Sequence, residues 1–188
     1  MREEKVMTES VYLGLGSNLG DRLENIINGL KEIAKIAKVE AVSSVYESEP
    51  WGEKYQPKFL NAVALVEYEG PPKKLLFELK MIERKLGRQP SSSRWGPREL
   101  DIDILLFGED VLESESLCIP HRYLCQRDFF LVPLLELNPD LVHPETMEPL
   151  ESYLVRLPAQ LRTIIGKVES RKWDTAVESF TRRSSKRK

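Results

Sequence analysis

Two aspartates separated by one residue, Asp101 and Asp103, are the clearest candidates for chemistry in this sequence of 188 residues. Apolar residues alternate with them across residues 100–107, which predicts a half-buried strand. Side chains two apart on a strand point to the same side, so we expect the carboxylates to lie together. Nearby carboxylates repel each other, and a Mg²⁺ ion held by acids and substrate phosphates would remove that conflict. The alternative is a solvent-facing strand with ordinary acids.

Arginines surround this strand in the sequence. They are Arg88, Arg94, Arg98 and Arg127, the first three in the polar loop of residues 88–99. The guanidinium group presents a fork of donors that suits phosphate oxygens. Paired acids beside several arginines are typical of phosphoryl-transfer sites, although composition alone also allows a solvated loop.

The spacing of the remaining candidate residues does not match known binding motifs. Gly14, Gly16 and Gly20 follow a predicted strand but match neither a dinucleotide fingerprint nor a phosphate-binding loop. We therefore expect Gly14 and Gly16 to allow close packing or unusual backbone angles. The Cys and His residues that could bind a metal are Cys118, His121, Cys125 and His143. Their irregular spacing argues against a zinc site.

The elements that must position these residues follow the order β-α-β-β-α-β. Helical spacing of apolar residues, with start signals before it, predicts helices over residues 21–37 and 71–87. Short apolar and β-branched runs predict strands over residues 11–15, 39–46, 60–68 and 100–107. Two helices on one face of an antiparallel sheet make an α+β, ferredoxin-like fold. The predicted C-terminal additions are a short strand at 111–112 and helices at 129–137 and 149–157.

Length and composition indicate one globular domain, with 41% hydrophobic and 31% charged residues. We expect a loose extension over residues 1–10, the domain over 11–158 and a C-terminal extension over 159–188. The last eighteen residues carry a net charge of +5 and the rest −7, and an acidic body does not favour nucleic-acid binding. The basic end, TRRSSKRK, is interpreted as a solvated, disordered tail.

The sequence also predicts a compartment. No apolar run approaches the roughly 20 residues that cross a bilayer, and the N-terminus lacks the apolar segment of a signal peptide. The two cysteines are too few for a disulfide scaffold and indicate a reducing environment. We expect a cytoplasmic protein without a membrane partner.

Five segments together resemble one family, the 6-hydroxymethyl-7,8-dihydropterin pyrophosphokinases of folate biosynthesis. The segments are VYLGLGSNLGDR, VSSVYESEPWG, PKFLNAVALVE, RWGPRELDIDILLFG and IPHRYLCQRDFFLVPLLEL. The resemblance spans residues 11–154, and the fourth segment is very specific because it joins the arginine-tryptophan loop to the paired-acid strand. It implies that the pterin's hydroxymethyl group attacks the β-phosphorus of ATP, so that pyrophosphate is transferred and AMP leaves.

The resemblance also implies roles around ATP. Asp101 and Asp103 match the family's acids that bind two Mg²⁺ ions. Arg88 and Arg98 match arginines that contact phosphate. These four residues form the expected catalytic group. Five further positions match residues near the nucleotide: Glu83, Trp95, Ile104, His121 and Arg127. Trp95 corresponds to a mobile tryptophan that helps to close the site.

For the pterin, Asn61 matches an amide that hydrogen-bonds the edge of the ring. Phe59 and Phe129 match two aromatic residues that sandwich it. The remaining implied contacts come from the backbone of the loop that carries Ser48, Pro50 and Trp51. Phe129 could instead serve only the core, because apolar residues follow it.

Two alternatives stay open from the residues alone. One is a ferredoxin-like RNA-binding module that uses the basic tail, which the acidic body disfavours. The other is a different Mg²⁺-dependent phosphotransferase or nuclease that uses the same acid pair. The expected partners are ATP and the pterin, with no nucleic acid, and the expected state is a monomer.

Overall fold

The computed structural model describes residues 8–52, 54–87 and 96–184. Its main sheet has six strands, all paired antiparallel, in the order β5-β1-β4-β3-β8, with β2 also pairing with β4. These strands are β1 (Thr8–Ser17), β2 (Lys38–Val42), β3 (Val45–Ser48), β4 (Phe59–Glu69), β5 (Asp101–Phe107) and β8 (Ile164–Val168). A separate small ribbon pairs β6 (Leu112–Glu113) with β7 (Cys118–Ile119).

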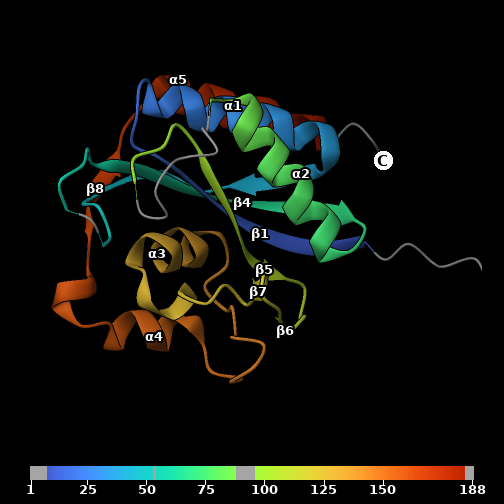
Figure 1. The fold of residues 1–188 in the computed structure, drawn as a ribbon, viewed down its shortest axis with the longest axis vertical. Coiled ribbons are helices and arrows are strands. Elements are labelled where there is room, and N and C mark those ends of the chain that lie inside the picture. Colours follow the sequence, from blue (N-terminus) through green and yellow to red (C-terminus); the bar gives the residue numbers. More distant parts are fainter. Residues whose placement is uncertain (1–7, 53, 88–95, 185–188) are drawn as a thin grey trace, which may run out of the picture.

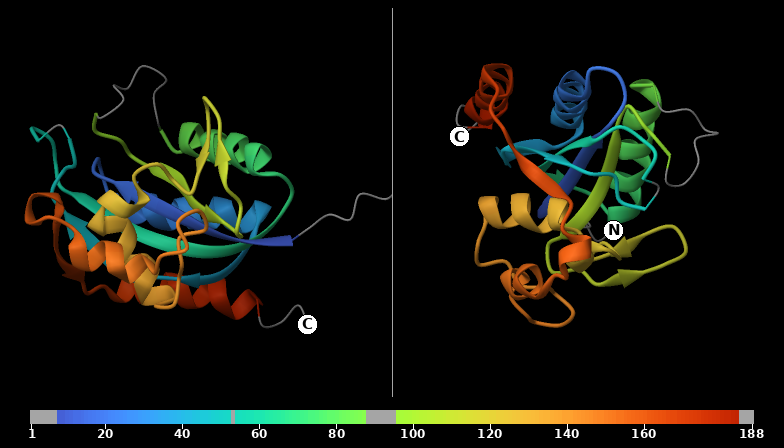
Figure 2. Two further views of the ribbon diagram at one scale, coloured as in Figure 1. Left: turned by 90° about the horizontal axis from the view of Figure 1, so that it is seen from below. Right: turned by 90° about the vertical axis from the view of Figure 1, so that its left-hand side faces the viewer.

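Helices cover both faces of the main sheet (Figures 1 and 2). On one face lie α1 (Arg22–Ile36), α2 (Pro72–Lys85) and α5 (Arg171–Ser184), and on the other lie α3 (Asp128–Leu137) and α4 (Leu150–Arg156). The elements from β1 to β5 follow the predicted β-α-β-β-α-β order, with β2 and β3 in the place of one predicted strand, and α1 and α2 share one face. The ferredoxin-like, α+β prediction is therefore confirmed.

The first helix forms where its sequence signals indicate. Asp21 caps it, because the Asp21 side chain accepts a hydrogen bond of 3.0 Å from the Glu24 backbone. Its buried residues recur at helical spacing and pack against the sheet: Ile26, Ile27, Leu30 and Ile33. Helix α2 begins at Pro72, in a first-turn position that needs no backbone N–H.

The predicted strand over residues 39–46 is instead two strands, β2 and β3, interrupted at Ser43 and Ser44. The Ser43 hydroxyl accepts a hydrogen bond of 2.9 Å from the Val63 backbone N–H, while the Ser43 N–H donates to the Val63 carbonyl. A side-chain oxygen therefore takes the place of a ladder carbonyl and bends the strand. Serine competes for backbone hydrogen bonds in this way, and two adjacent serines were the available signal.

The C-terminal extension forms β8 and α5, which the sequence did not predict. Because α5 ends at Ser184, the first four residues of the basic end TRRSSKRK belong to a helix and not to a disordered tail, and the last four lie outside the described residues. Trp173 and Phe180 of α5 are buried in the core, with Ala176 and Val177 packed beside them. These positions have the i, i+3, i+4, i+7 spacing of an amphipathic helix, which the basic residues around them obscured. At the other end, β1 begins at Thr8, so residues 8–10 belong to the sheet and not to a loose extension.

Among the described residues, no helix is both long enough and apolar enough to span a bilayer.

Candidate active site

Asp101 and Asp103 lie on the face of the sheet opposite α1 and α2. In the pairing of β5 with β1, Asp101 lies beside Gly16 and Asp103 beside Gly14. The residues that alternate with them, Ile102 and Ile104, belong to the core under α1 and α2. The acids are partly buried, with side chains 23% and 26% exposed. The predicted placement on one side is confirmed, but the face is less solvated than an open strand would be.

Glycines in β1 leave a floor without side chains between the acids and an amide. Gly16 pairs with Asp101 on one side and with Asn61 of β4 on the other. A Cβ atom at Gly16 would lie 3.4 Å from the Asn61 Oδ1, at the base of the space between these residues. At Gly14 it would lie only 3.0 Å from the Phe130 ring of α3. Close packing is thus confirmed at Gly14, and neither glycine has a positive φ.

A pocket opens above this floor, between the loop after β3 and the start of α3. We call it the amide pocket because Asn61 lies in it and is 6% exposed. The Asn61 Nδ2 donates to the Ser48 hydroxyl at 2.9 Å, which fixes the orientation of the amide. Further side chains in the lining are Glu49, Trp51, Gln56, Phe59, Arg98, Asp101, Asp103, Arg127, Phe129 and Phe130.

A second pocket lies on the other side of Asp103, toward α2 and the β6–β7 ribbon. We call it the lysine pocket after Lys80 of α2. Its lining also includes Leu76, Ile104, Ser114, Ser116, Cys118, His121, Arg122 and Tyr123. Asp103 lines both pockets. Two ligands, one in each pocket, would therefore meet at this carboxylate.

The charges around Asp103 favour a bound cation. Burial, and after it the nearby Asp101 carboxylate, raises the pKa of Asp103 to about 6 against the opposing effect of neighbouring cations. The His121 Nε2 is 3.9 Å from Asp103, too far for a hydrogen bond. Burial, chiefly, lowers the pKa of His121 to about 3, so this imidazole is neutral near pH 7. Two neighbouring carboxylates that disfavour each other's charged form suit a hard divalent cation such as Mg²⁺.

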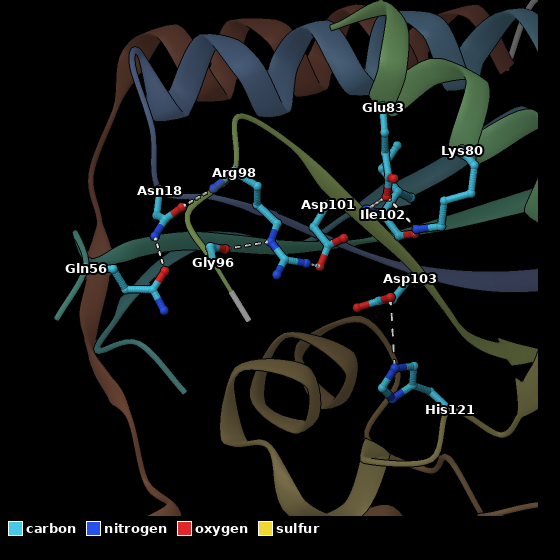
Figure 3. Close-up of polar contacts among 10 residues, drawn as sticks. All are labelled: Asn18, Gln56, Lys80, Glu83, Gly96, Arg98, Asp101, Ile102, Asp103 and His121. Atoms are coloured by element: carbon cyan, nitrogen blue, oxygen red, sulfur yellow. Dashed lines mark hydrogen bonds and ion pairs between the residues drawn. The ribbon is translucent and has the colours of Figure 1, made fainter. Parts of the chain in front are cut away.

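No cluster of three or more His, Cys, Asp or Glu side chains suited to a metal occurs in the described part of the chain. Asp101 and Asp103 fit Mg²⁺ as a pair that leaves coordination positions for phosphate oxygens and water. The Arg98 Nη1 donates to the Asp101 Oδ2 at 2.8 Å, so one oxygen of that carboxylate is already engaged (Figure 3).

Arg127 lies in a cage of aromatic rings. Its Cζ is 4.6 Å from the centre of the Trp51 ring, 4.8 Å from that of Tyr123 and 5.5 Å from that of Phe129. Cation–π contacts of this kind hold a guanidinium group in a fixed place. Burial lowers the pKa of Arg127, and the two aspartates oppose that shift. A fixed cation thus lies beside the amide pocket and near both acids.

Two further residues hold the acid strand and its loop (Figure 3). Glu83 of α2 accepts 2.7 Å and 2.6 Å hydrogen bonds from the Ile102 N–H and the Lys80 ammonium. Asn18 accepts a bond of 2.7 Å from the Arg98 N–H and donates to Gln56 at 3.0 Å. Both side chains are buried. Asn18 fixes the backbone just before the two aspartates, and Glu83 fixes it between them.

The structure brings most of the predicted site residues together. The amide pocket collects Ser48, Trp51, Phe59, Asn61, Arg98, Asp101, Asp103, Arg127 and Phe129, and the lysine pocket collects Ile104 and His121. Pro50 lines a neighbouring cavity with Trp51. Glu83 lines neither pocket and is hidden behind β5. Arg88 and Trp95 lie outside the described residues.

Sequence reasoning missed several lining residues. Lys80 lies one helical turn before Glu83. A lysine three residues from a glutamate on a helix is an ordinary ion pair, so this spacing did not indicate a binding site. Gln56 and Tyr123 lie in loops, where spacing predicts no orientation. Asn18 lies in the glycine-rich segment, and only its contacts show that it connects two loops.

Comparison with known proteins gives a consistent result. The family model for 7,8-dihydro-6-hydroxymethylpterin-pyrophosphokinase (HPPK) matches residues 12–139. The 2-amino-4-hydroxy-6-hydroxymethyldihydropteridine pyrophosphokinase of Aquifex aeolicus is 42% identical over 144 residues, 77% of this chain and 89% of that protein. The folic acid synthesis protein fol1 of Schizosaccharomyces pombe is 44% identical over 84% of this chain, which corresponds to 22% of that longer protein.

Solved structures agree at the level of the fold. A crystal structure of wild-type Plasmodium falciparum HPPK-DHPS with pterin and p-hydroxybenzoate superimposes with a TM-score of 0.66 and 17% identity. The superposition covers 82% of this chain and 44% of that one. The matched family model and the 42% identity to a protein of similar length show that the chain belongs to the 7,8-dihydro-6-hydroxymethylpterin-pyrophosphokinase family.

Proposed function

We propose that the protein transfers pyrophosphate from ATP to 6-hydroxymethyl-7,8-dihydropterin in folate biosynthesis, giving the pterin diphosphate and AMP. Membership of the pyrophosphokinase family supports this reaction. The observation that carries the placement of the substrates is that two pockets meet at Asp103. We assign the pterin to the amide pocket and the nucleotide to the lysine pocket.

The assignment of the pterin follows from the lining of the amide pocket. An amide has both donors and acceptors, as the edge of a pterin requires, and Asn61 is held in one orientation by Ser48. Flat rings stack favourably on aromatic side chains, and Phe59 and Phe129 supply them. The glycine floor at Gly16 leaves room for a flat ring to lie against β1. In this orientation the hydroxymethyl group would point toward the two aspartates.

In the reaction, the hydroxymethyl group loses its proton to solvent water, its oxygen forms a bond to the β-phosphorus, and the bond from that phosphorus to the oxygen of the α-phosphate breaks. The electron pair of the broken bond leaves with AMP. Bound by Asp101 and Asp103, two Mg²⁺ ions would neutralise charge on the triphosphate and lower the pKa of the hydroxyl group. Arg98 and Arg127, with Arg88 from outside the described residues, would contact phosphate oxygens. The protein's contribution is mainly to orient two substrates and to fix positive charge.

The remaining predicted contacts belong to the nucleotide. Ile104 and His121 line the lysine pocket, where the neutral imidazole can donate or accept a hydrogen bond. Lys80 adds a positive charge at the same place. Trp95 is proposed to close over ATP, and Glu83 to act on the nucleotide side only through Lys80 and β5. The RNA-binding and general phosphotransferase alternatives are not favoured, because the family match specifies pyrophosphoryl transfer.

The direct test incubates the protein with ATP, Mg²⁺ and the hydroxymethyl-dihydropterin and identifies the nucleotide product. We expect AMP, and ADP would contradict the proposal. Asp101→Asn and Asp103→Asn should each lower turnover at least about a hundredfold, because each removes a charge that holds the metal-bound triphosphate. Asp110→Asn, the same change at an exposed aspartate just after β5, is the control and should retain activity. Mg²⁺ titrations of these variants would show whether the metal dependence shifts with the two aspartates.

Cytoplasmic location and a monomeric state remain predictions from the sequence. Cell fractionation and size-exclusion chromatography with light scattering would test them.

A further inference from the structure

Asp128 is a buried acid that none of the roles above uses. It is the first residue of α3 and is 4% exposed. Its neighbours in the chain, Arg127 and Phe129, both line the amide pocket, whereas Asp128 does not. Its carboxylate points away, toward the segment that leads into β8. The Asp128 Oδ2 accepts hydrogen bonds from the backbone N–H groups of Thr163 and Ile164 at 2.6 and 2.8 Å, and Oδ1 accepts one from the Thr163 hydroxyl at 2.7 Å.

Thr163 continues the connection to the opposite wall of the pocket. Its carbonyl accepts a hydrogen bond of 2.9 Å from the Glu49 N–H. Glu49 follows the last residue of β3 and lies two residues before Trp51, whose ring packs on the Arg127 guanidinium at 4.6 Å. The contacts therefore form a closed ring from Arg127 through Asp128, Thr163 and Glu49 to Trp51 and back to Arg127.

This ring lies between two cavities. On one side is the amide pocket, which Glu49 and Trp51 line. On the other side is the cavity lined by Pro50, Trp51, Arg162 and Thr163. With an open space on each side, the ring of contacts links the loop after β3 to the start of α3. The segment that carries Thr163 crosses from the α4 side of the sheet to the α5 side (Figure 2), beyond residues 12–139 that match the family model.

We propose that Asp128 and Thr163 are positioning residues for the pterin. The inference rests on the proposed function, because it assumes that the pterin binds in the amide pocket. Asp128 holds the start of α3, and thus Arg127 and Phe129, at a fixed distance from the loop that carries Trp51. The C-terminal segment is therefore part of the pterin site, although its side chains lie outside the pocket. None of these residues lines the lysine pocket, and Arg127 keeps its separate contact with the Tyr123 ring, so the effect should fall mainly on the pterin.

The test compares two Thr→Val changes in the same C-terminal segment. Thr163→Val removes the hydroxyl bond to Asp128 and retains the backbone N–H. Thr181→Val is the matched control, because the Thr181 hydroxyl donates only within α5, to the Val177 carbonyl. Asp128→Asn is the stronger change, since it removes the carboxylate charge that strengthens all three of these hydrogen bonds. Thr163→Ser, which restores the hydroxyl group, provides the conservative rescue.

We expect Thr163→Val to raise KM for the pterin roughly threefold to tenfold, less than the full loss of a hydrogen bond to a charged group, because both backbone N–H bonds to Asp128 remain. Asp128→Asn should raise it more, and KM for ATP should change less than about twofold in either variant. Thr163→Ser and Thr181→Val should match the wild type. Equilibrium titration of the pterin by its fluorescence should show the same order of affinity without turnover.

The inference would be overturned if folded Thr163→Val and Asp128→Asn bound the pterin as the wild type does. It would also be overturned if KM for both substrates rose together, because a general loss of structure would then explain the effect. If Asp128→Asn does not fold, the comparison of Thr163→Val with Thr163→Ser and Thr181→Val decides. A wild-type protein that makes no AMP would instead refute the proposed function, so the two failures are distinguishable.

Discussion

Substitution of Glu83 distinguishes two possible roles of this residue: direct contact with ATP, or holding β5 in place. The resemblance places Glu83 on the nucleotide side, but the structure buries it with 1% of the residue exposed. Its Oε1 accepts hydrogen bonds from the Ile102 N–H at 2.7 Å and from the Lys80 ammonium at 2.6 Å. Ile102 lies between the two aspartates. We therefore expect substitutions of Glu83 mainly to lower the free energy of unfolding, and to affect the two aspartates only indirectly, through the backbone of Ile102.

The size of the effect follows from these partners. In Glu83→Ala the Ile102 N–H is left buried without an acceptor, which costs about 1–3 kcal/mol, and a buried methylene is lost, worth about 0.8 kcal/mol. The Lys80 side chain is 37% exposed, so its ammonium regains water and adds little. We expect a loss of about 2–4 kcal/mol in the free energy of unfolding, or a fall in Tm of about 5–15 °C for a chain of this size. Glu83→Gln retains an acceptor for Ile102 and should lose less than about 1 kcal/mol, because its amide oxygen can still accept from Lys80, whose side chain is 37% exposed.

Thermal and urea unfolding measure the stabilities, and KM for ATP is measured well below both Tm values. Lys80→Gln is a useful companion, because it removes the same ion pair and leaves the Ile102 bond in place. We expect Glu83→Gln to bind ATP nearly as the wild type does. A Glu83→Gln variant with unchanged Tm and a KM for ATP raised tenfold or more would refute the reasoning, since it would show that the carboxylate acts on the nucleotide directly.

Three further predictions follow from the described residues. Gly16→Ala should keep its Tm but raise KM for the pterin at least about tenfold by filling the floor, whereas Gly14→Ala should lower Tm, because its Cβ would lie 3.0 Å from Phe130. His143 accepts backbone N–H bonds at its Nδ1, and burial lowers its pKa from 6.5, so the folded state binds its proton less readily than the unfolded state. Unfolding free energy should therefore fall as pH drops below about 6.5, and this slope in urea titrations should be shallower in His143→Asn. Burial raises the pKa of the Cys125 thiol to about 11, so its alkylation by iodoacetamide at pH 8 should be slow until the protein unfolds, and rapid labelling of the native protein at Cys125 would contradict this.

Local periodicity was sufficient to predict the main helices and strands, and to predict that the side chains of Asp101 and Asp103 point to the same side of their strand. Strand residues two apart face the same side whatever the rest of the chain does, so the spacing of Asp101 and Asp103 is enough to place them together. The same holds for the helix that begins after Asp21, because its cap and apolar stripe lie within one segment. The motifs around these residues also indicated the family, since they occur in a fixed order along the chain.

Contacts between distant segments were decided only by the tertiary structure. The floor at Gly16 exists because β1 pairs with β5 on one side and β4 on the other, and no spacing within one strand specifies that register. Lys80 of α2 and Arg127, just before α3, lie near the acids, and charged residues of ordinary type give no sign of their partner. Docking of α5 likewise depends on burial of Trp173, whose indole N–H donates to the Ser43 carbonyl more than a hundred residues earlier in the chain. A sequence determines periodicity and local hydrogen bonding, whereas long-range pairing and burial depend on the free energy of the whole chain.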